Sequence, residues 1–435
     1  MASVRIAPAP RLAGSVRVPP DKSITHRALL LAALSDRRVL IERPLDSEDT
    51  AATLNAVEAC RVEVSGLLGH SLEIRGHGLR GLRPPPLIGC GNSGTLMRLV
   101  AGALVGQAAD RVLLDGDESL RRRPMLRIAV PLREMGAQVV TAPGGVPPMV
   151  VSGGNALTGV THRLEVASAQ VKSCLLLAGL FAEGETWVHE PAPSRDHTER
   201  MLAASGVPIL RDGVLGVGIR GPVAGIDLPD LEVPGDPSSA AFHLVAGALL
   251  ADPSVRLVGV NLNPRRTGLL RVMERMGATV DMQLGPEVAG EPCGDLVVTR
   301  AGTLHATEIA PEEVPTLIDE LPLVGLLGAL AAGTTVVRGA EELRVKESDR
   351  IATVVQALRA LGVRAEERTD GFEVTGAPRL VGGTVEAHGD HRLAMLGAIA
   401  GLVSAEGVTV SGFEAAAVSY PGFASDVAAL GGVAA

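Results

Sequence analysis

Six stretches of this chain share one pattern, in which a few polar or basic residues precede a run of about ten apolar residues. In the first stretch, residues 21–27 lead into residues 28–34, which are apolar on every side and therefore predict a buried helix. The equivalent positions along the chain are Ser23, Ser93, Ser168, Ser238, Asp319 and His391. Successive copies are 70, 75, 70, 81 and 72 residues apart, so the chain is built from repeats.

A second pattern recurs between these stretches, where a predicted helix ends in glycine and a predicted strand follows. The glycines are Gly136, Gly206, Gly277 and Gly362, with weaker copies at residues 58–62 and 429–431. Glycine suits the left-handed position just past a helix end. Self-similarity at a fixed period indicates repeated supersecondary units. We therefore expect an α/β protein of six small units, each with strands and helices.

The length of the chain predicts more than one domain, because 435 residues exceed what a single hydrophobic core usually supports. Residues 4–18 alternate between apolar and polar positions and predict one strand, which a proline pair at 19–20 ends. Proline-rich sequence at residues 222–237 indicates a domain crossing near 231–236. These signals predict one domain of residues 21–233 with three units, and a second of residues 1–20 and 234–435 with the other three.

The composition excludes several classes of protein. The net charge is −9 and only 2% of residues are aromatic, which argues against a nucleic-acid partner. The four cysteines are scattered and the histidines show no ligand spacing, so neither a disulfide frame nor a metal site is expected. The start of the chain lacks the pattern of a signal peptide, and apolar runs of about 10–14 residues are too short to span a bilayer. We expect a cytoplasmic protein with no membrane partner.

The polar fronts of the predicted buried helices are candidates for anion binding. A helix N-terminus carries free N–H groups and a positive partial charge, which together attract anions. The fronts also hold five cations, namely Lys22, Arg27, Arg98, Lys172 and Arg392. Serine and aspartate at a single helix start are also explained by ordinary capping. Six fronts with this many cations, however, predict a pocket for several negative charges.

The motifs on these fronts resemble those of the 5-enolpyruvylshikimate-3-phosphate synthases, a family of enolpyruvyl transferases. The resemblance rests on residues 22–27, 91–98, 123–124, 168–170, 344–350 and 390–392, and the run Arg-Val-Lys-Glu-Ser-Asp-Arg at 344–350 is the most specific of them. The resemblance implies two similar domains, each of three units, with the active site in the cleft between them. It implies transfer of the enolpyruvyl group of phosphoenolpyruvate to the 5-hydroxyl of shikimate 3-phosphate, with release of phosphate.

The resemblance also implies which residues bind the two substrates, each of which carries a phosphate and a carboxylate. Arginine forks suit both groups. The residues implied for phosphoenolpyruvate are Lys22, Gly94, Arg123, Gln170, Arg350 and Arg392. The residues implied for shikimate 3-phosphate are Lys22, Ser23, Arg27, Ser168, Ala169, Gln170, Arg195, Asp319 and Lys346.

Three residues are implied to carry the chemistry: Asp319, Glu347 and Lys22. The reaction needs a proton on the methylene carbon of phosphoenolpyruvate and loss of a proton from the attacking hydroxyl, which two carboxylates among cations can manage. Asp319 is the expected base or hydroxyl-positioning group, and Glu347 the expected acid, although the division of roles stays open. From the residues alone, Asp319 also fits a helix cap and Glu347 also fits a solvated surface ion pair.

The chain departs from the family pattern at two positions. Val418 stands where many members have a lysine, and Ala169 stands where many have a second serine. Each departure puts one substrate contact in doubt. Gly94 leaves room that an alanine would fill, and we expect the inhibitor glyphosate to compete with phosphoenolpyruvate.

Two other functions remain as alternatives. A UDP-N-acetylglucosamine enolpyruvyl transferase shares the fold, but that family uses a loop cysteine and residues 110–124 contain none. A non-catalytic anion-binding relative would have lost Lys22, Asp319 or Glu347, and all three are present. The resemblance implies neither a metal nor an organic cofactor, and a monomer is expected because the repeats bury their own cores.

Overall fold

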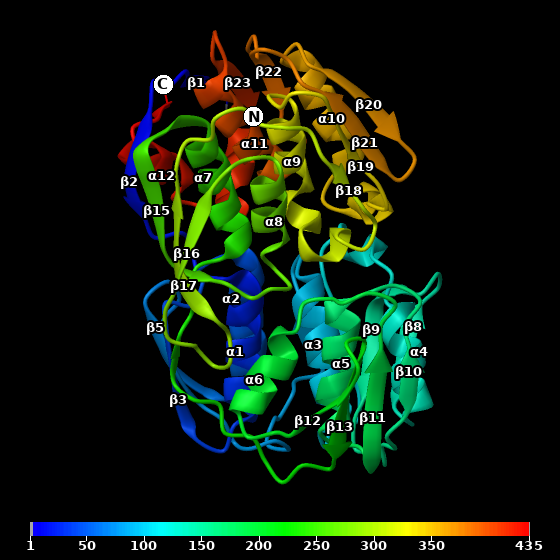
Figure 1. Ribbon diagram of the computed structural model, residues 1–435. Helices are drawn as coiled ribbons and strands as arrows, with labels where there is room; N and C mark the ends of the chain where they lie inside the picture. Colours follow the sequence, from blue (N-terminus) through cyan, green and yellow to red (C-terminus); the bar gives the residue numbers. More distant parts are fainter. Residues whose placement is uncertain (1–2, 435) are drawn as a thin grey trace. The chain divides into compact units, whose positions relative to one another are not determined.

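The computed structural model describes residues 3–434. Met1 and Ala2, which belong to the segment used for the signal-peptide prediction, lie outside the described residues. The chain divides into two compact units (Figure 1). The central unit comprises Pro20–Val233 together with Glu287–Glu291. The terminal unit comprises the chain up to Pro19, Pro234–Pro286, and the chain from Pro292 onward. Each unit has its own hydrophobic core.

Three four-stranded sheets and six α-helices form the central unit. The strands are β3 (Arg38–Glu42), β4 (Glu63–Leu67), β5 (Ser71–Arg75), β6 (Leu87–Gly89), β7 (Val112–Asp115), β8 (Gln138–Ala142), β9 (Val146–Ser152), β10 (Thr161–Arg163), β11 (Gly184–His189), β12 (Ile209–Asp212), β13 (Gly216–Gly221) and β14 (Leu231–Glu232). The helices are α1 (Lys22–Leu34), α2 (Glu48–Ala59), α3 (Gly94–Leu104), α4 (Leu126–Glu134), α5 (Ala169–Gly179) and α6 (His197–Ala204).

The terminal unit repeats this composition of three four-stranded sheets and six α-helices. Its strands are β1 (Ser3–Ala7), β2 (Leu12–Val16), β15 (Ala251–Asn261), β16 (Val280–Leu284), β17 (Cys293–Val298), β18 (Glu308–Ile309), β19 (Thr334–Val337), β20 (Arg364–Arg368), β21 (Gly371–Thr375), β22 (Gly383–Glu386), β23 (Val408–Ser411) and β24 (Val433–Ala434). Its helices are α7 (Pro237–Leu250), α8 (Gly268–Arg275), α9 (Leu321–Gly328), α10 (Arg350–Ala360), α11 (His391–Val403) and α12 (Phe423–Ala429).

All six sheets have the same pairing pattern, which confirms the predicted repeat. In β6-β7-β9-β8, for example, the first pair is parallel and the next two pairs are antiparallel. The sheet β22-β23-β1-β24 follows this pattern with strands from both ends of the chain. In the same way, β14 comes from the end of the central segment and pairs with β3 of the first repeat.

The apolar runs are buried helices, as the sequence predicted. All residues of α1 from Ile24 to Leu34 are buried, and α3 and α5 contact each other in the same core. In the terminal unit, α7, α9 and α11 contact one another in the same manner. A helix that is apolar on every side has to be surrounded in this way, because any exposed face would leave apolar area in water.

The predicted turns past the helices are also observed. Gly136, Gly206, Gly277 and Gly362 have φ values of 97°, 86°, 97° and 84°, which lie in the left-handed region that favours glycine. In the weaker copy at residues 58–62, Arg61 takes this conformation with φ 68°.

The prediction of one strand over residues 4–18 is wrong. The structure has two strands there, β1 and β2, which belong to different sheets. Pro8 and Pro10 lie between them, and proline lacks the N–H that a continuous strand would donate.

Candidate active site

The buried helices of the central unit begin with capping side chains. Asp21, Ser93 and Ser168 cap α1, α3 and α5, and each accepts a hydrogen bond from the backbone N–H three residues further on, at 3.1, 3.1 and 3.4 Å. Ordinary capping therefore operates at these fronts. The cations that follow the caps are additional, and their contacts decide what each front can bind.

Lys22, the first residue of α1, contacts an acid from the neighbouring helix. Its Nζ donates to Oδ2 of Asp49 at 3.1 Å, and its side chain is 31% exposed. Burial acts to raise the pKa of Asp49, but the positive charge of Lys22 outweighs it and holds that pKa below its ordinary value. Lys22 is thus a partly exposed cation of this front.

His26, one turn further along α1, is buried and neutral. Its Nδ1 lies 2.7 Å from Oγ1 of Thr53. Burial lowers its pKa from 6.5 to about 3, because the charged imidazolium would lose its hydration. His26 therefore adds no positive charge to this front at neutral pH.

Arg27 is held by side chains of two neighbouring helices and by one backbone carbonyl of its own helix. It donates from Nε to Thr198 Oγ1 at 2.7 Å, from one terminal nitrogen to Ser173 Oγ at 2.8 Å, and from the other to the carbonyl of Ser23 at 2.9 Å. Burial lowers its pKa to about 10, and the negative charge of Glu199 opposes that shift. The guanidinium therefore stays charged and has a fixed orientation.

A second group joins the fronts of α3 and α5. Arg98 donates to Oε1 of Gln170 at 2.5 Å, and the Gln170 amide nitrogen donates to Thr95 at 2.9 Å. Arg123 donates to Oδ1 of Asn92 at 2.6 Å. A Cβ on Gly94 would lie 2.9 Å from a terminal nitrogen of Arg98 and 3.3 Å from one of Arg123. The glycine therefore lets two guanidinium groups approach the first turn of α3.

One predicted cation is not available to an anion. Lys172 is 2% exposed, and its Nζ donates to Oε2 of Glu190 at 2.6 Å and contacts Oε1 of Glu199 at 2.9 Å. The expectation that Lys172 contributes to an anion pocket is therefore wrong. Both carboxylates come from outside α5, so the sequence near Lys172 gave no sign of this pairing.

In the terminal unit, one guanidinium connects three acids. Arg350, which is 1% exposed, donates to Asp390 at 2.8 Å, to Glu347 at 2.6 Å and to Asp319 at 3.4 Å. Burial acts to lower the pKa of Arg350, but Glu347, Asp390 and Asp319 outweigh it and raise that pKa above its ordinary value. Burial likewise acts to raise the pKa of Asp390, but Arg350 outweighs it and lowers that pKa.

Arg392 completes this group at the front of α11. It donates to the backbone carbonyl of Asp319 at 3.1 Å and approaches the Asp319 carboxylate at 3.8 Å. The structure therefore brings together four of the predicted residues, Asp319, Glu347, Arg350 and Arg392. The motif at 390–392 also supplies Asp390, an acid that sequence reasoning left without a role.

The contacts decide between the alternative interpretations of the two acids. Asp319 lies in a short 3₁₀ helix, and α9 has no side-chain cap, so Asp319 is not a helix cap. Glu347 is paired with a buried arginine, so it is not a solvated surface pair. Lys346 and Val418 are exposed.

The remaining predicted residues lie on the central unit. Ser23 and Ala169 lie in the first turns of α1 and α5, and Arg195 lies just before α6. The positive charge of Arg195 acts on Arg27, so the two are electrostatic neighbours. Sequence reasoning missed Asp49, which lies in the first turn of α2 behind the cap Ser47.

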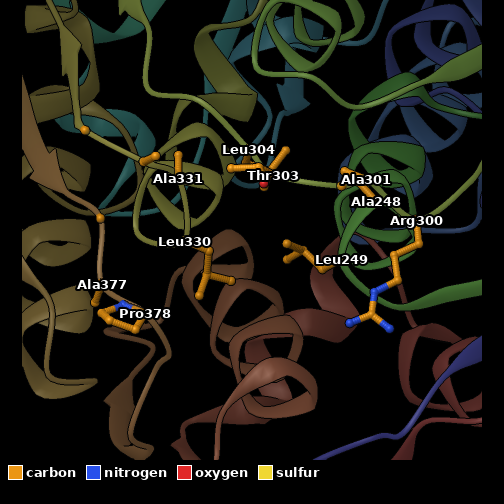
Figure 2. A pocket seen from close by; sticks show the side chains of 14 residues that line it. Ala248, Leu249, Arg300, Ala301, Thr303, Leu304, Leu330, Ala331, Ala377 and Pro378 are labelled. Atoms are coloured by element: carbon orange, nitrogen blue, oxygen red, sulfur yellow. The ribbon is translucent and has the colours of Figure 1, made fainter.

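A pocket of about 520 Å³ lies elsewhere, at the C-terminal ends of α7 and α9 in the terminal unit (Figure 2). Alanine, glycine and leucine dominate its lining, and Arg300 is the one charged residue among those that line it. It lacks the paired acid and base that the chemistry requires.

No group of three histidine, cysteine or acidic residues within residues 3–434 is placed to hold a metal. Across the same residues, no helix is long and apolar enough to cross a membrane.

Comparison with known proteins gives a consistent result over the whole chain. The family model described as EPSP synthase (3-phosphoshikimate 1-carboxyvinyltransferase) matches residues 6–427. A 3-phosphoshikimate 1-carboxyvinyltransferase of Gloeobacter violaceus is 48% identical over 96% of each chain. One from Halorhodospira halophila is 46% identical over 98% of this chain and 96% of that protein. The solved EPSP synthase of Acinetobacter baumannii has a TM-score of 0.90 and 38% identity, and the match covers 100% of this chain and 99% of that one.

Proposed function

This chain belongs to the EPSP synthase family, and from that premise we propose that it transfers the enolpyruvyl group of phosphoenolpyruvate to the 5-hydroxyl of shikimate 3-phosphate. The observation that carries the proposal is the pair of residue groups just described. One unit offers Lys22 and Arg27 on α1 and Arg123 near the first turn of α3, and the other holds Asp319 and Glu347 against the buried Arg350. Anion binding and acid–base chemistry are the two things the reaction requires.

The assignment of residues to substrates follows the resemblance to the family. For phosphoenolpyruvate we propose Lys22, Gly94, Arg123, Gln170, Arg350 and Arg392. For shikimate 3-phosphate we propose Lys22, Ser23, Arg27, Ser168, Ala169, Gln170, Arg195, Asp319 and Lys346. At Ala169 only the backbone can donate, because the side chain carries no polar atom.

The chemistry needs one proton delivered and one removed. The 5-hydroxyl oxygen attacks C2 of phosphoenolpyruvate while a proton is added to C3, which gives a tetrahedral adduct. The attacking oxygen loses its proton, and the adduct then loses phosphate and a proton from the new methyl group. We assign the deprotonation or positioning of the hydroxyl to Asp319, and proton delivery to C3 to Glu347, with Lys22 as a further candidate for that delivery.

The contacts of Arg350 supply a route by which Glu347 becomes an acid. With no substrate, Arg350 donates to Glu347 at 2.6 Å, which favours the ionised carboxylate. Binding of phosphoenolpyruvate at Arg350 requires some of its donors to leave their carboxylate partners. Glu347 is the most exposed of the three carboxylate partners, at 37% against 15% for Asp319 and 0% for Asp390, so we propose that it is the one that leaves. Next to a bound anion its pKa rises, because a like charge disfavours ionisation.

The test is phosphate release by the purified protein with both substrates, with each omitted in turn, and with UDP-N-acetylglucosamine as the alternative acceptor. Release that requires shikimate 3-phosphate is expected. Asp319→Asn and Glu347→Gln should each lower kcat by about 10²–10⁴-fold, the usual contribution of a general acid or base. Glu366→Gln, which alters an exposed pair with Arg364, is the control and should leave kcat unchanged. Release with the nucleotide sugar alone would overturn the proposal.

We also propose that the enzyme is a cytoplasmic monomer. Support comes from the two separate hydrophobic cores, which enclose their own buried helices without a second chain. Sedimentation equilibrium across a range of concentrations would show a single species of 44.7 kDa. A concentration-dependent increase in mass would contradict this.

A further inference from the structure

Four charged side chains are buried together in the central unit. Arg27, Lys172, Glu190 and Glu199 are 4%, 2%, 6% and 2% exposed. Lys172 contacts both carboxylates, at 2.6 Å to Glu190 and 2.9 Å to Glu199. Two positive charges and two negative charges are thus grouped with little exposure to water. Such a group is stable only when each charge has its partner.

Both carboxylates lead to residues assigned to shikimate 3-phosphate. The second oxygen of Glu190 accepts a hydrogen bond from the backbone N–H of Ser168 at 3.1 Å, and Ser168 caps α5. Glu199 is the strongest favourable charge acting on Arg27. Thr198, its neighbour on α6, accepts the hydrogen bond from Arg27 Nε at 2.7 Å. Glu190 therefore holds the front of α5 through Ser168, and Glu199 acts on the Arg27 guanidinium through its charge.

Lys172 controls whether Arg27 is available to a ligand. A guanidinium has five N–H donors, and Arg27 uses three of them in bonds to Thr198, Ser173 and Ser23. The other donors remain for an anion. Without Lys172, Glu199 would have Arg27 as its strongest cation and would compete with that anion for the same donors.

From this geometry we propose that Lys172 is a positioning residue for the phosphate or carboxylate of shikimate 3-phosphate. It holds Glu199 away from the free donors of Arg27 and holds Glu190 on Ser168, and it does not touch the substrate itself. The proposal rests on the proposed function. It extends that function by naming buried residues, Lys172, Glu190 and Glu199, that position the substrate-binding side chains without contacting the substrate.

The first experiment is Lys172→Met, because methionine matches the length of lysine and removes its charge. The KM for shikimate 3-phosphate should rise about tenfold or more, which is the effect of leaving a buried charge without its partner. The KM for phosphoenolpyruvate and kcat should stay within about threefold of wild type. An equal rise of both KM values, or no rise in a folded protein, would overturn the proposal.

Two double variants with the same net charge make the test independent of that single variant's folding. In Lys172→Met with Glu199→Gln, the carboxylate opposite Arg27 is gone, so the KM for shikimate 3-phosphate should return to within about threefold of wild type. In Lys172→Met with Glu190→Gln, Glu199 remains opposite Arg27 and Ser168 loses its charged acceptor, so that KM should stay raised. Equal KM values in the two double variants would refute the mechanism.

Leu176→Ala is the control for simple loss of stability. Leu176 lies one turn beyond Lys172 on α5 and is fully buried, so its truncation lowers the melting temperature without altering a charge. Its two KM values should match wild type. The wild-type protein in the same assay separates the two proposals: absence of any turnover would contradict the proposed function, whereas turnover with unchanged KM in the variants would contradict only the role of Lys172.

Discussion

Replacing Arg350 by methionine would leave Asp319, Glu347 and Asp390 without the guanidinium that contacts all three. Arg350 is 1% exposed and Asp390 is 0% exposed, so water cannot take over the lost interactions. Asp390 also accepts from the hydroxyl of Ser348 at 2.9 Å and caps α11. The substitution therefore removes a contact from the capping residue of one buried helix. It also removes a contact from each of the two proposed catalytic acids.

The expected cost is large because a buried acid would be left without its cation. Breaking a buried pair by removing one partner costs about 3–5 kcal/mol. At about 2–4 °C per kcal/mol for a domain of 150–250 residues, this corresponds to a fall of about 6–20 °C in the melting temperature. Arg350→Lys keeps the charge, but one ammonium cannot copy the planar fork, so an intermediate loss is expected.

The assay is thermal unfolding at pH 7 together with the KM for phosphoenolpyruvate. Arg364→Met is the control, because Arg364 lies in the same unit and pairs with Glu366 at 3.0 Å, yet the two side chains are 77% and 54% exposed. Such a pair contributes about 0–1 kcal/mol. If Arg350→Met melts no earlier than Arg364→Met, Arg350 is not the centre of a buried charge group.

Three further predictions concern the central unit. Gly94→Ala places a Cβ 2.9 Å from Arg98 and 3.3 Å from Arg123, so both side chains must shift. The KM for phosphoenolpyruvate should therefore rise about five- to thirtyfold. An unchanged KM in steady-state kinetics would contradict this. The pKa of His26 is about 3 in the folded protein, against an ordinary value of 6.5 for the unfolded chain. As the pH falls, the unfolded state therefore binds the proton first. The free energy of unfolding should fall below pH 6.5 by up to ~1.4 kcal/mol per pH unit. Urea unfolding of His26→Gln should show a flatter pH profile, and an identical profile would count against the assignment. Glyphosate, which carries a carboxylate and a phosphonate, should inhibit in competition with phosphoenolpyruvate, and indifference at millimolar inhibitor would argue against that site.

The repeats and the buried helices could be predicted because they are local signals. Hydrophobicity on every side of a run such as Ala28–Leu34 says that a helix is buried, whatever surrounds it. The composition of each sheet was not a local signal. β1 pairs with β23 and β24 from the opposite end of the sequence, and β14 pairs with β3 from the first repeat. No periodicity within a strand identifies such a partner.

The same division applies to the candidate site. The cations at the helix fronts are visible in the sequence because they follow the caps directly. Their acidic partners are not, since Asp49 lies 27 residues from Lys22 and Asp390 lies 40 residues from Arg350. Lys172 is an example. A lysine at a helix front suggests anion binding, but the structure shows that this one is already paired with two carboxylates.

These partners also explain how an acid can work among so many arginines. In the terminal unit, Arg350 and Arg392 face three carboxylates, so the group carries more negative than positive charge before any substrate binds. A phosphate or carboxylate that joins it adds further negative charge and makes the protonated form of one carboxylate more favourable. Asp390 is buried, and its pKa is held low by Arg350, whereas Glu347 is 37% exposed and contacts the same arginine at 2.6 Å. We therefore propose that Glu347 takes up the proton on substrate binding and delivers it to the methylene carbon.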